Sequence, residues 1–152
     1  MSGLLGLDVG ERRIGVAWGD PTTGVVRPLR TVGRGRTEDD VRTIGRVAAE
    51  SGAEAIVVGL PLDAAGGEGR QAAAIRAWAD AVLPAVGLPV RWRDERHTSQ
   101  RAEARLGGLP RGRSGGPPSP AARRAWRARV DREAAAEILR AEIDAGSSEA
   151  GS

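Results

Sequence analysis

The chain has 152 residues, of which 40% are hydrophobic, and this suits one globular domain with a single core. It contains no cysteine, which excludes disulfides, thiolate zinc sites and cysteine nucleophiles. Lysine is also absent and the 23 cationic side chains are all arginine, so a P-loop lysine and a Schiff-base lysine are excluded as well.

The formal net charge is only +3, but the charge is unevenly distributed along the chain. Residues 91–132 contain 12 arginines and four acidic residues, whereas the rest of the chain has 11 arginines and 16 acidic residues. This asymmetry favours a polyanionic partner on one side of the molecule. A solvated run of charge would produce the same pattern, so this alternative stays open.

The N-terminal segment is predicted to form a β-hairpin that carries a misplaced acid. Two apolar runs, residues 4–7 and 14–18, flank a polar link. Asp8 continues the first run, where a carboxylate is a poor strand former and is costly to bury unpaired. A bound divalent cation is the favoured explanation, because such ions take carboxylate oxygens. An aspartate that caps the adjacent turn is the alternative.

The next elements alternate between strand and helix patterns. Residues 25–32 predict a third strand, which Pro28 restricts to a sheet edge. Thr37 is expected to be the N-cap of a helix that ends at Gly52. The short apolar run of residues 55–58 is typical of a central strand that is covered on both faces.

The second half of the chain continues this alternation and ends in helices. The predicted elements are a helix over 71–83, a strand over 89–93, a helix over 99–106, a flexible Gly/Pro/Arg-rich arm over about 107–120, and a helix over 121–145 before a disordered tail. The order predicts an α/β domain over residues 1–145 with a mixed five-stranded sheet flanked by helices, and a tail over 146–152.

Two further acids occupy positions that suggest chemistry. Glu95 follows the strand over 89–93, and Asp131 falls on the apolar stripe of the last helix with Ala134 and Ile138. Together with Asp8, these carboxylates could converge on two Mg²⁺ or Mn²⁺ ions, which suit oxygen ligands. A nearby arginine could instead explain Asp131. The single histidine, His97, is a surface residue or a proton shuttle.

Several segments together resemble the YqgF/RuvX family over about residues 4–143. They are GLDVG at 6–10, RIGVA at 13–17, VVGLPL at 57–62, DER at 94–96 and Val130–Asp131. The resemblance implies an RNase H-like fold and activity on Holliday junctions or on pre-16S rRNA. It also implies that Asp8, Glu95 and Asp131 are the catalytic acids. The family usually continues the DER motif with Leu-Thr-Thr, whereas this chain has His97-Thr98-Ser99.

The combined expectation is a metal-dependent endonuclease that processes the 5′ end of pre-16S rRNA. Asp8, Glu95 and Asp131 would hold the Mg²⁺ or Mn²⁺ ions. The residues expected to contact phosphates are Arg13, Arg96, Arg111, Arg113, Arg123, Arg124 and Arg127. A nuclease for branched or single-stranded DNA, which would need a dimer to resolve a junction, is one alternative. A ribosome-maturation factor that mainly binds nucleic acid is another.

The expected setting follows from what the sequence lacks. No basic segment precedes an apolar run at the N-terminus, and no apolar run approaches the length of a membrane span. We therefore expect a cytoplasmic protein that does not engage a membrane. The sequence leaves open whether the protein is a monomer or a homodimer.

Overall fold

The computed structural model describes residues 3–95, 98–109, 111–112 and 114–150. Within these residues, the strands are β1 (Gly3–Val9), β2 (Arg13–Gly19), β3 (Val26–Gly33), β4 (Ala53–Leu60) and β5 (Val90–Asp94). The helices are α1 (Thr37–Ser51), α2 (Arg70–Val86), α3 (Thr98–Leu106) and α4 (Pro120–Ala150). This order of strands and helices is the one that the sequence predicted.

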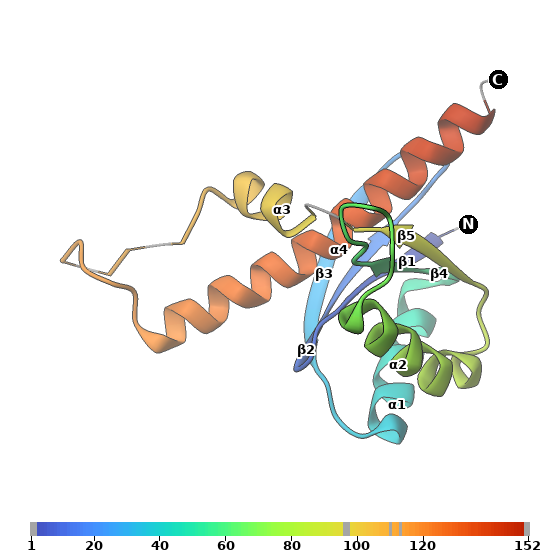
Figure 1. Ribbon diagram of the computed structural model, residues 1–152, viewed down its shortest axis with the longest axis horizontal. Helices are drawn as coiled ribbons and strands as arrows, with labels where there is room; N and C mark the ends of the chain where they lie inside the picture. The colour runs from blue at the N-terminus through green and yellow to red at the C-terminus, as the bar shows by residue number, and fades with distance from the viewer. Residues whose placement is uncertain (1–2, 96–97, 110, 113, 151–152) are drawn as a thin grey trace.

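The strands form one mixed sheet with the order β3-β2-β1-β4-β5. The three N-terminal strands pair antiparallel, and β4 lies parallel to both β1 and β5. Helices α1 and α2 cover one face of the sheet, and α4 crosses the other face with α3 beside it (Figure 1). The expected α/β architecture with a five-stranded sheet is therefore confirmed.

The alternation of side chains along β1 builds a core on each face of the sheet. Leu5 and Leu7 are fully buried in the larger cluster, which includes Ile44 of α1 and Trp78 of α2. Leu4 points the other way into a smaller cluster with Leu139 of α4. Because successive strand residues face opposite sides, Asp8 shares the α4 face of the sheet with Leu4.

Glycines on the α4 face allow the helix to approach the strands closely. A Cβ atom on Gly15 of β2 would overlap the backbone oxygen of Asp131 and lie 2.8 Å from the nitrogen of Arg132. A Cβ atom on Gly6 of β1 would lie 2.9 Å from the backbone oxygen of Ala135. The helix backbone therefore rests where these two strands have no side chains.

Strand β3 is an edge strand, as Pro28 predicted. The register with β2 shifts between Val16, which pairs with Arg30, and Ala17, which pairs with Pro28. The skipped residue, Leu29, is 39% exposed. A bulge at this point accommodates a proline that has no N–H to donate to the sheet.

The helix ends differ in part from the expected ones. The cap of α1 is Arg36, without a capping side-chain hydrogen bond, so the assignment of Thr37 as the N-cap was wrong. The carboxylate of buried Asp40 instead accepts a hydrogen bond of 2.8 Å from the N–H of Gly35. Helix α2 runs beyond the expected end at residue 83, through Pro84, to Val86.

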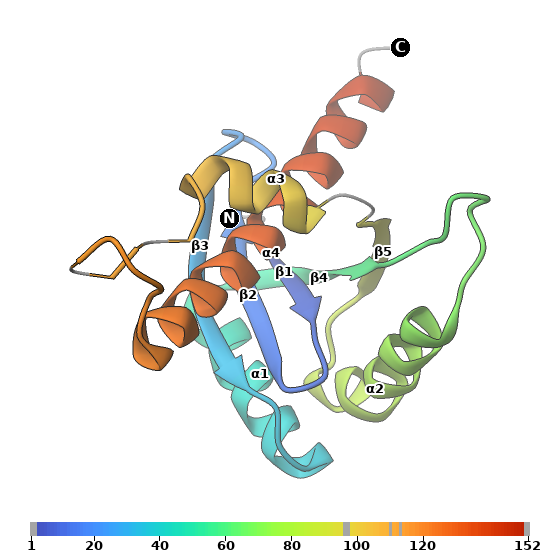
Figure 2. The same cartoon turned by 60° about the vertical axis from the view of Figure 1, so that its left-hand side comes forward.

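Helix α4 is longer than expected, and the arm before it stands apart from the sheet. Residues 146–150 continue α4, whereas the sequence analysis expected a disordered tail there. The described residues of the arm (107–109, 111–112 and 114–119) lie away from the sheet in both views (Figures 1 and 2). A backbone hydrogen bond of 2.9 Å from Gly112 to Gly116 forms a turn near its tip. None of the helices within the described residues is long and apolar enough to span a membrane.

The close approach at Gly15 predicts a large effect of one methyl group. We expect Gly15→Ala to lower the unfolding free energy by about 1–3 kcal/mol or more, because the helix backbone cannot yield as a flexible side chain can. Gly45→Ala, in α1, is the matched control, since a Cβ atom there meets nothing within 4 Å. This control should raise stability by up to about 1 kcal/mol. Urea unfolding of both variants measures the difference, and equal midpoints would contradict the packing argument.

Candidate active site

The sheet brings two of the predicted acids, Asp8 and Glu95, together at the carboxyl ends of β1 and β5. Leu7 pairs with Val58, so Asp8 lies next to Gly59 at the end of β4. Glu95 directly follows β5, and its N–H donates a 3.1 Å hydrogen bond to the backbone oxygen of Leu60. A Cβ atom on Gly59 would lie 2.7 Å from Glu95 Oε2. The absence of a side chain at position 59 therefore leaves room for the Glu95 carboxyl.

The Asp8 and Glu95 carboxyls are hydrogen-bonded to each other and shift each other's protonation. Burial is the main cause that raises the pKa of Asp8; the hydrogen bond with Glu95 lowers it, and the charge of Asp131 raises it again. Burial, followed by the negative charge of Asp8, raises the pKa of Glu95 to about 9. Without a cation, Glu95 therefore stays protonated at neutral pH and donates its proton to the Asp8 carboxylate.

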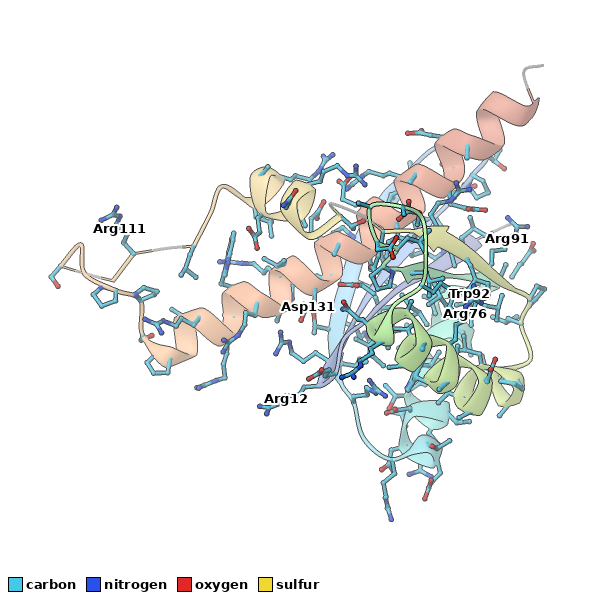
Figure 3. The ribbon with its side chains drawn as sticks, in the orientation of Figure 1. Arg12, Arg76, Arg91, Trp92, Arg111 and Asp131 are labelled. Carbon is cyan, nitrogen blue, oxygen red and sulfur yellow. The ribbon has the colours of Figure 1, made fainter. Side chains whose placement is uncertain are left out.

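The third acid, Asp131, lies on α4 close to this pair but has a different partner. Arg13 Nε donates a 2.6 Å hydrogen bond to Asp131 Oδ2, and the Asp131 side chain is 21% exposed. Figure 3 shows Asp131 on the side of α4 that faces the strands. In the described part of the chain, no three acidic or histidine side chains form a group that could hold a metal ion. The sequence prediction thus brings two carboxylates together, with the third ion-paired nearby.

Two adjacent hollows open onto these acids. The larger, about 740 Å³, is lined by Asp8 and Glu95. The smaller, about 300 Å³, is lined by Asp131, Arg12 and Arg13. Gly10, in the turn between β1 and β2, lines both hollows. The acids therefore face a surface depression that solvent and a substrate can reach.

Three polar residues that the sequence analysis did not single out also line the larger hollow. They are Gln71 near the start of α2, and Thr98 and Gln100 in the first turn of α3. The Thr98 side chain is buried, and its N–H donates a 3.0 Å hydrogen bond to the backbone oxygen of Glu95. Their signal in the sequence is positional, since each begins a helix that follows a strand of the parallel pair.

The predicted phosphate-binding arginines fall into three groups. Arg13 is committed to Asp131. Arg96 and Arg113, together with His97, lie outside the described residues. The third group is exposed and forms no ion pair within the described part of the chain. It consists of Arg111, Arg123, Arg124 and Arg127. Arg111 projects from the outlying arm, away from Asp131 (Figure 3).

Some of the arginines in residues 91–132 have a structural role instead. Arg93 Nη2 lies 2.6 Å from Glu142 Oε2, which ties β5 to α4. Arg105 of α3 lies 3.3 Å from Glu133 and 3.0 Å from Glu137, two buried carboxylates of α4. Acids that follow residue 132 therefore neutralise part of the positive excess that residues 91–132 carry in the sequence.

The Asp8–Glu95 pair fits a divalent cation by its chemistry. Both groups are oxygen donors, both are largely withdrawn from water, and they must give up the shared proton before they can both be ionised. A divalent cation would supply the positive charge that this close pair lacks. Asp131 could join them only by sharing its carboxylate with Arg13 or leaving it.

The raised pKa of Glu95 predicts how stability depends on pH in chelator. The folded protein retains a proton at Glu95 that the unfolded chain releases above its ordinary pKa of 4.5. The unfolding free energy should therefore fall as pH rises from 4.5 to about 9, where the folded group also ionises. Glu95→Gln should flatten this slope, while Glu54→Gln, at an exposed acid of β4, should keep it. Thermal melts across this range measure the slope, and parallel profiles for Glu95→Gln and the unchanged protein would refute the shared proton.

Comparisons with known proteins agree with the resemblance noted in the sequence. The sequence model of the family described as "RuvX: Holliday junction resolvase" matches residues 2–145. A "Putative pre-16S rRNA nuclease" of Chloroflexus aggregans is 46% identical over 106 residues, which cover 70% of this chain and 75% of that protein. A protein of the same name from Anaeromyxobacter sp. (strain Fw109-5) is 40% identical over 140 residues, or 92% of this chain and 95% of its own length.

Two solved structures share the fold at low sequence identity. Thermus thermophilus RuvC in complex with a Holliday junction substrate has a TM-score of 0.54 and 18% identity, over 95% of each chain. The Fowlpox virus resolvase in complex with Holliday junction DNA has a TM-score of 0.55 and 9% identity, over 94% of this chain and 97% of its own. These neighbours establish an RNase H-like fold. The chain therefore belongs to the RuvX family of RNase H-like nucleases.

Proposed function

We propose that this protein is a metal-dependent endonuclease that hydrolyses phosphodiester bonds during 5′-end processing of pre-16S rRNA. The observation that carries the proposal is the half-buried Asp8–Glu95 pair, which opens onto a hollow of about 740 Å³. Two carboxyls whose pKa values are both raised, at a cleft, are a signature of functional sites. The names of the curated relatives favour rRNA as the substrate.

Each acid has a distinct part in this proposal. Asp8 and Glu95 bind Mg²⁺ or Mn²⁺, and the bound ions would activate water and stabilise charge on the phosphate oxygens. Asp131 completes the ligand set once its carboxylate is shared with or released by Arg13. Arg13 is then free to contact a phosphate oxygen, since its guanidinium lies at the same edge of the sheet.

Holliday-junction DNA is the alternative substrate of the same class. It is supported by the description of the matching family and by the junction complexes of the two solved neighbours. A junction nuclease would need two active sites and hence a dimer. Cleavage of precursor RNA, single-stranded DNA and a four-way junction in Mg²⁺ and Mn²⁺ distinguishes these substrates.

Substitution of the acids tests the catalytic assignment. We expect Asp8→Asn, Glu95→Gln and Asp131→Asn each to abolish cleavage, while each variant still binds substrate in Ca²⁺. The double variant Glu95→Gln/Asp131→Asn should be scarcely worse than either single variant, because groups that act as a unit are not additive. Single-turnover cleavage and binding in Ca²⁺ measure the two properties separately.

Asp94→Asn is the matched control for Glu95→Gln. Adjacent strand residues face opposite sides of the sheet, so Asp94 affects Glu95 only through its charge, which helps to raise the Glu95 pKa, and this variant should keep substantial activity. Loss of activity in Asp94→Asn but not in Glu95→Gln would show that Asp94, and not Glu95, is the catalytic acid. Wild-type rates in Asp131→Asn would place the third ligand elsewhere. A protein that binds RNA but never cleaves it would support the maturation-factor alternative.

The exposed arginines are expected to contribute to the affinity for RNA but not to the cleavage step. Arg111 of the arm and Arg124 of α4 are exposed and form no ion pair in the described part of the chain. For the double variant Arg111→Ala/Arg124→Ala, we expect weaker RNA binding and a salt slope that is lower by roughly 0.7 per lost contact. Turnover at saturating substrate should change little. An unchanged salt slope would show that these arginines do not contact phosphates.

A further inference from the structure

A third hollow adjoins the candidate active site. It measures about 540 Å³ and lies between the β1–β2 turn and the start of α2. Val9, Gly10 and Gln71 line both this hollow and the larger one that contains Asp8 and Glu95. The two hollows are therefore neighbours along one continuous groove.

Two arginines supply the cationic groups of this hollow. Arg34 is half-buried, and its Nη1 donates a 2.8 Å hydrogen bond to the backbone oxygen of Gly10, two residues from Asp8. Arg70, the first residue of α2, is exposed and forms no ion pair within the described residues. The acid that lines the same hollow is Glu11, which is exposed in the turn. The balance of charge in this hollow is thus positive.

The chemistry of these groups suits a phosphodiester. Guanidinium groups present a planar fork of donors that matches phosphate oxygens, and they remain charged at every relevant pH. The start of α2 beside Arg70 adds the positive end of a helix dipole. Ala74 and Ile75 provide an apolar wall for a sugar or base. The hollows of about 540 and 740 Å³ share lining residues, so one extended strand can cross both.

We propose that the Arg34–Arg70 hollow binds the phosphate of a single-stranded nucleotide that flanks the scissile bond. This inference rests on the proposed nuclease function and extends it, because it places one flank of the substrate strand at the start of α2. The hollows that contain Arg70, the Asp8–Glu95 pair and Arg12 all meet at Gly10. Arg34 positions the turn beside Asp8 as well as the phosphate, whereas Arg70 contacts the substrate alone.

Arg70→Ala tests this site, with Arg46→Ala as its matched control. Arg46 is an exposed arginine of α1 that forms no ion pair within the described residues and lines none of these three hollows. The two variants lose the same charge, so only a local contact can separate them. The measurement is the affinity for a single-stranded RNA in Ca²⁺ as a function of salt, followed by cleavage rates at saturating RNA in Mg²⁺.

We expect Arg70→Ala to weaken binding several-fold, to lower the salt slope by roughly 0.7 and to raise the KM for RNA more than it lowers kcat. Arg46→Ala should match the unchanged protein. Shortening the RNA on one flank of the cleavage site should abolish the difference between Arg70→Ala and the unchanged protein, and shortening the other flank should not. The double variant Arg70→Ala/Arg124→Ala should lose the product of the two single losses, because the two sites are separate.

Two results would overturn the proposal. In the first, Arg70→Ala and Arg46→Ala bind RNA equally well. In the second, the defect of Arg70→Ala persists whichever flank is shortened, which would indicate a general charge effect rather than a fixed position. Both are binding results, so they are distinguishable from failure of the nuclease assignment, which would appear as cleavage that Asp8→Asn does not remove.

Discussion

The close contact between α4 and the glycines of the N-terminal strands is the constraint on which the site depends. Gly15 pairs with Asp8 across β1 and β2, and the helix backbone at Asp131 lies directly over it. A larger residue at position 15 would push the helix outward and separate Asp131 from the strand acids. The same contact holds the smaller core together through Leu139 and its neighbours, so stability and site geometry share one origin.

The half-buried Asp8–Glu95 carboxyl pair carries an electrostatic cost that other groups at the site must offset. Two acids next to each other in a poorly solvated position destabilise the folded chain unless a proton or a cation lies between them. Burial and the charge of Asp8 raise the pKa of Glu95 to about 9, which favours its protonated form, and Arg13 pairs with Asp131. Such strained groups persist at functional sites because selection for activity outweighs their cost in stability.

The arginines divide into structural and exposed sets by the positions of their partners. Glu133, Glu137 and Glu142 of α4 form ion pairs with arginines of β5 and α3, so those arginines connect these elements to α4. Arg111, Arg123, Arg124 and Arg127 have no such partners in the described part of the chain, and they remain available to an anion. A count of charge along the sequence cannot separate these sets, because the neutralising acids lie in a different segment.

The sequence by itself determined the order of elements, the edge position of β3 and the placement of three acids at strand and helix positions where acids are unfavourable. These features follow from local periodicity, from Pro28 and from side-chain alternation, which need no knowledge of distant contacts. Only the tertiary structure decided that Glu95 shares a proton with Asp8, that Asp131 pairs with Arg13 and that Arg34 and Arg70 border one groove. Each of these depends on sheet register and on the path of a helix across the sheet, which join residues far apart in the chain through packing rather than through local pattern.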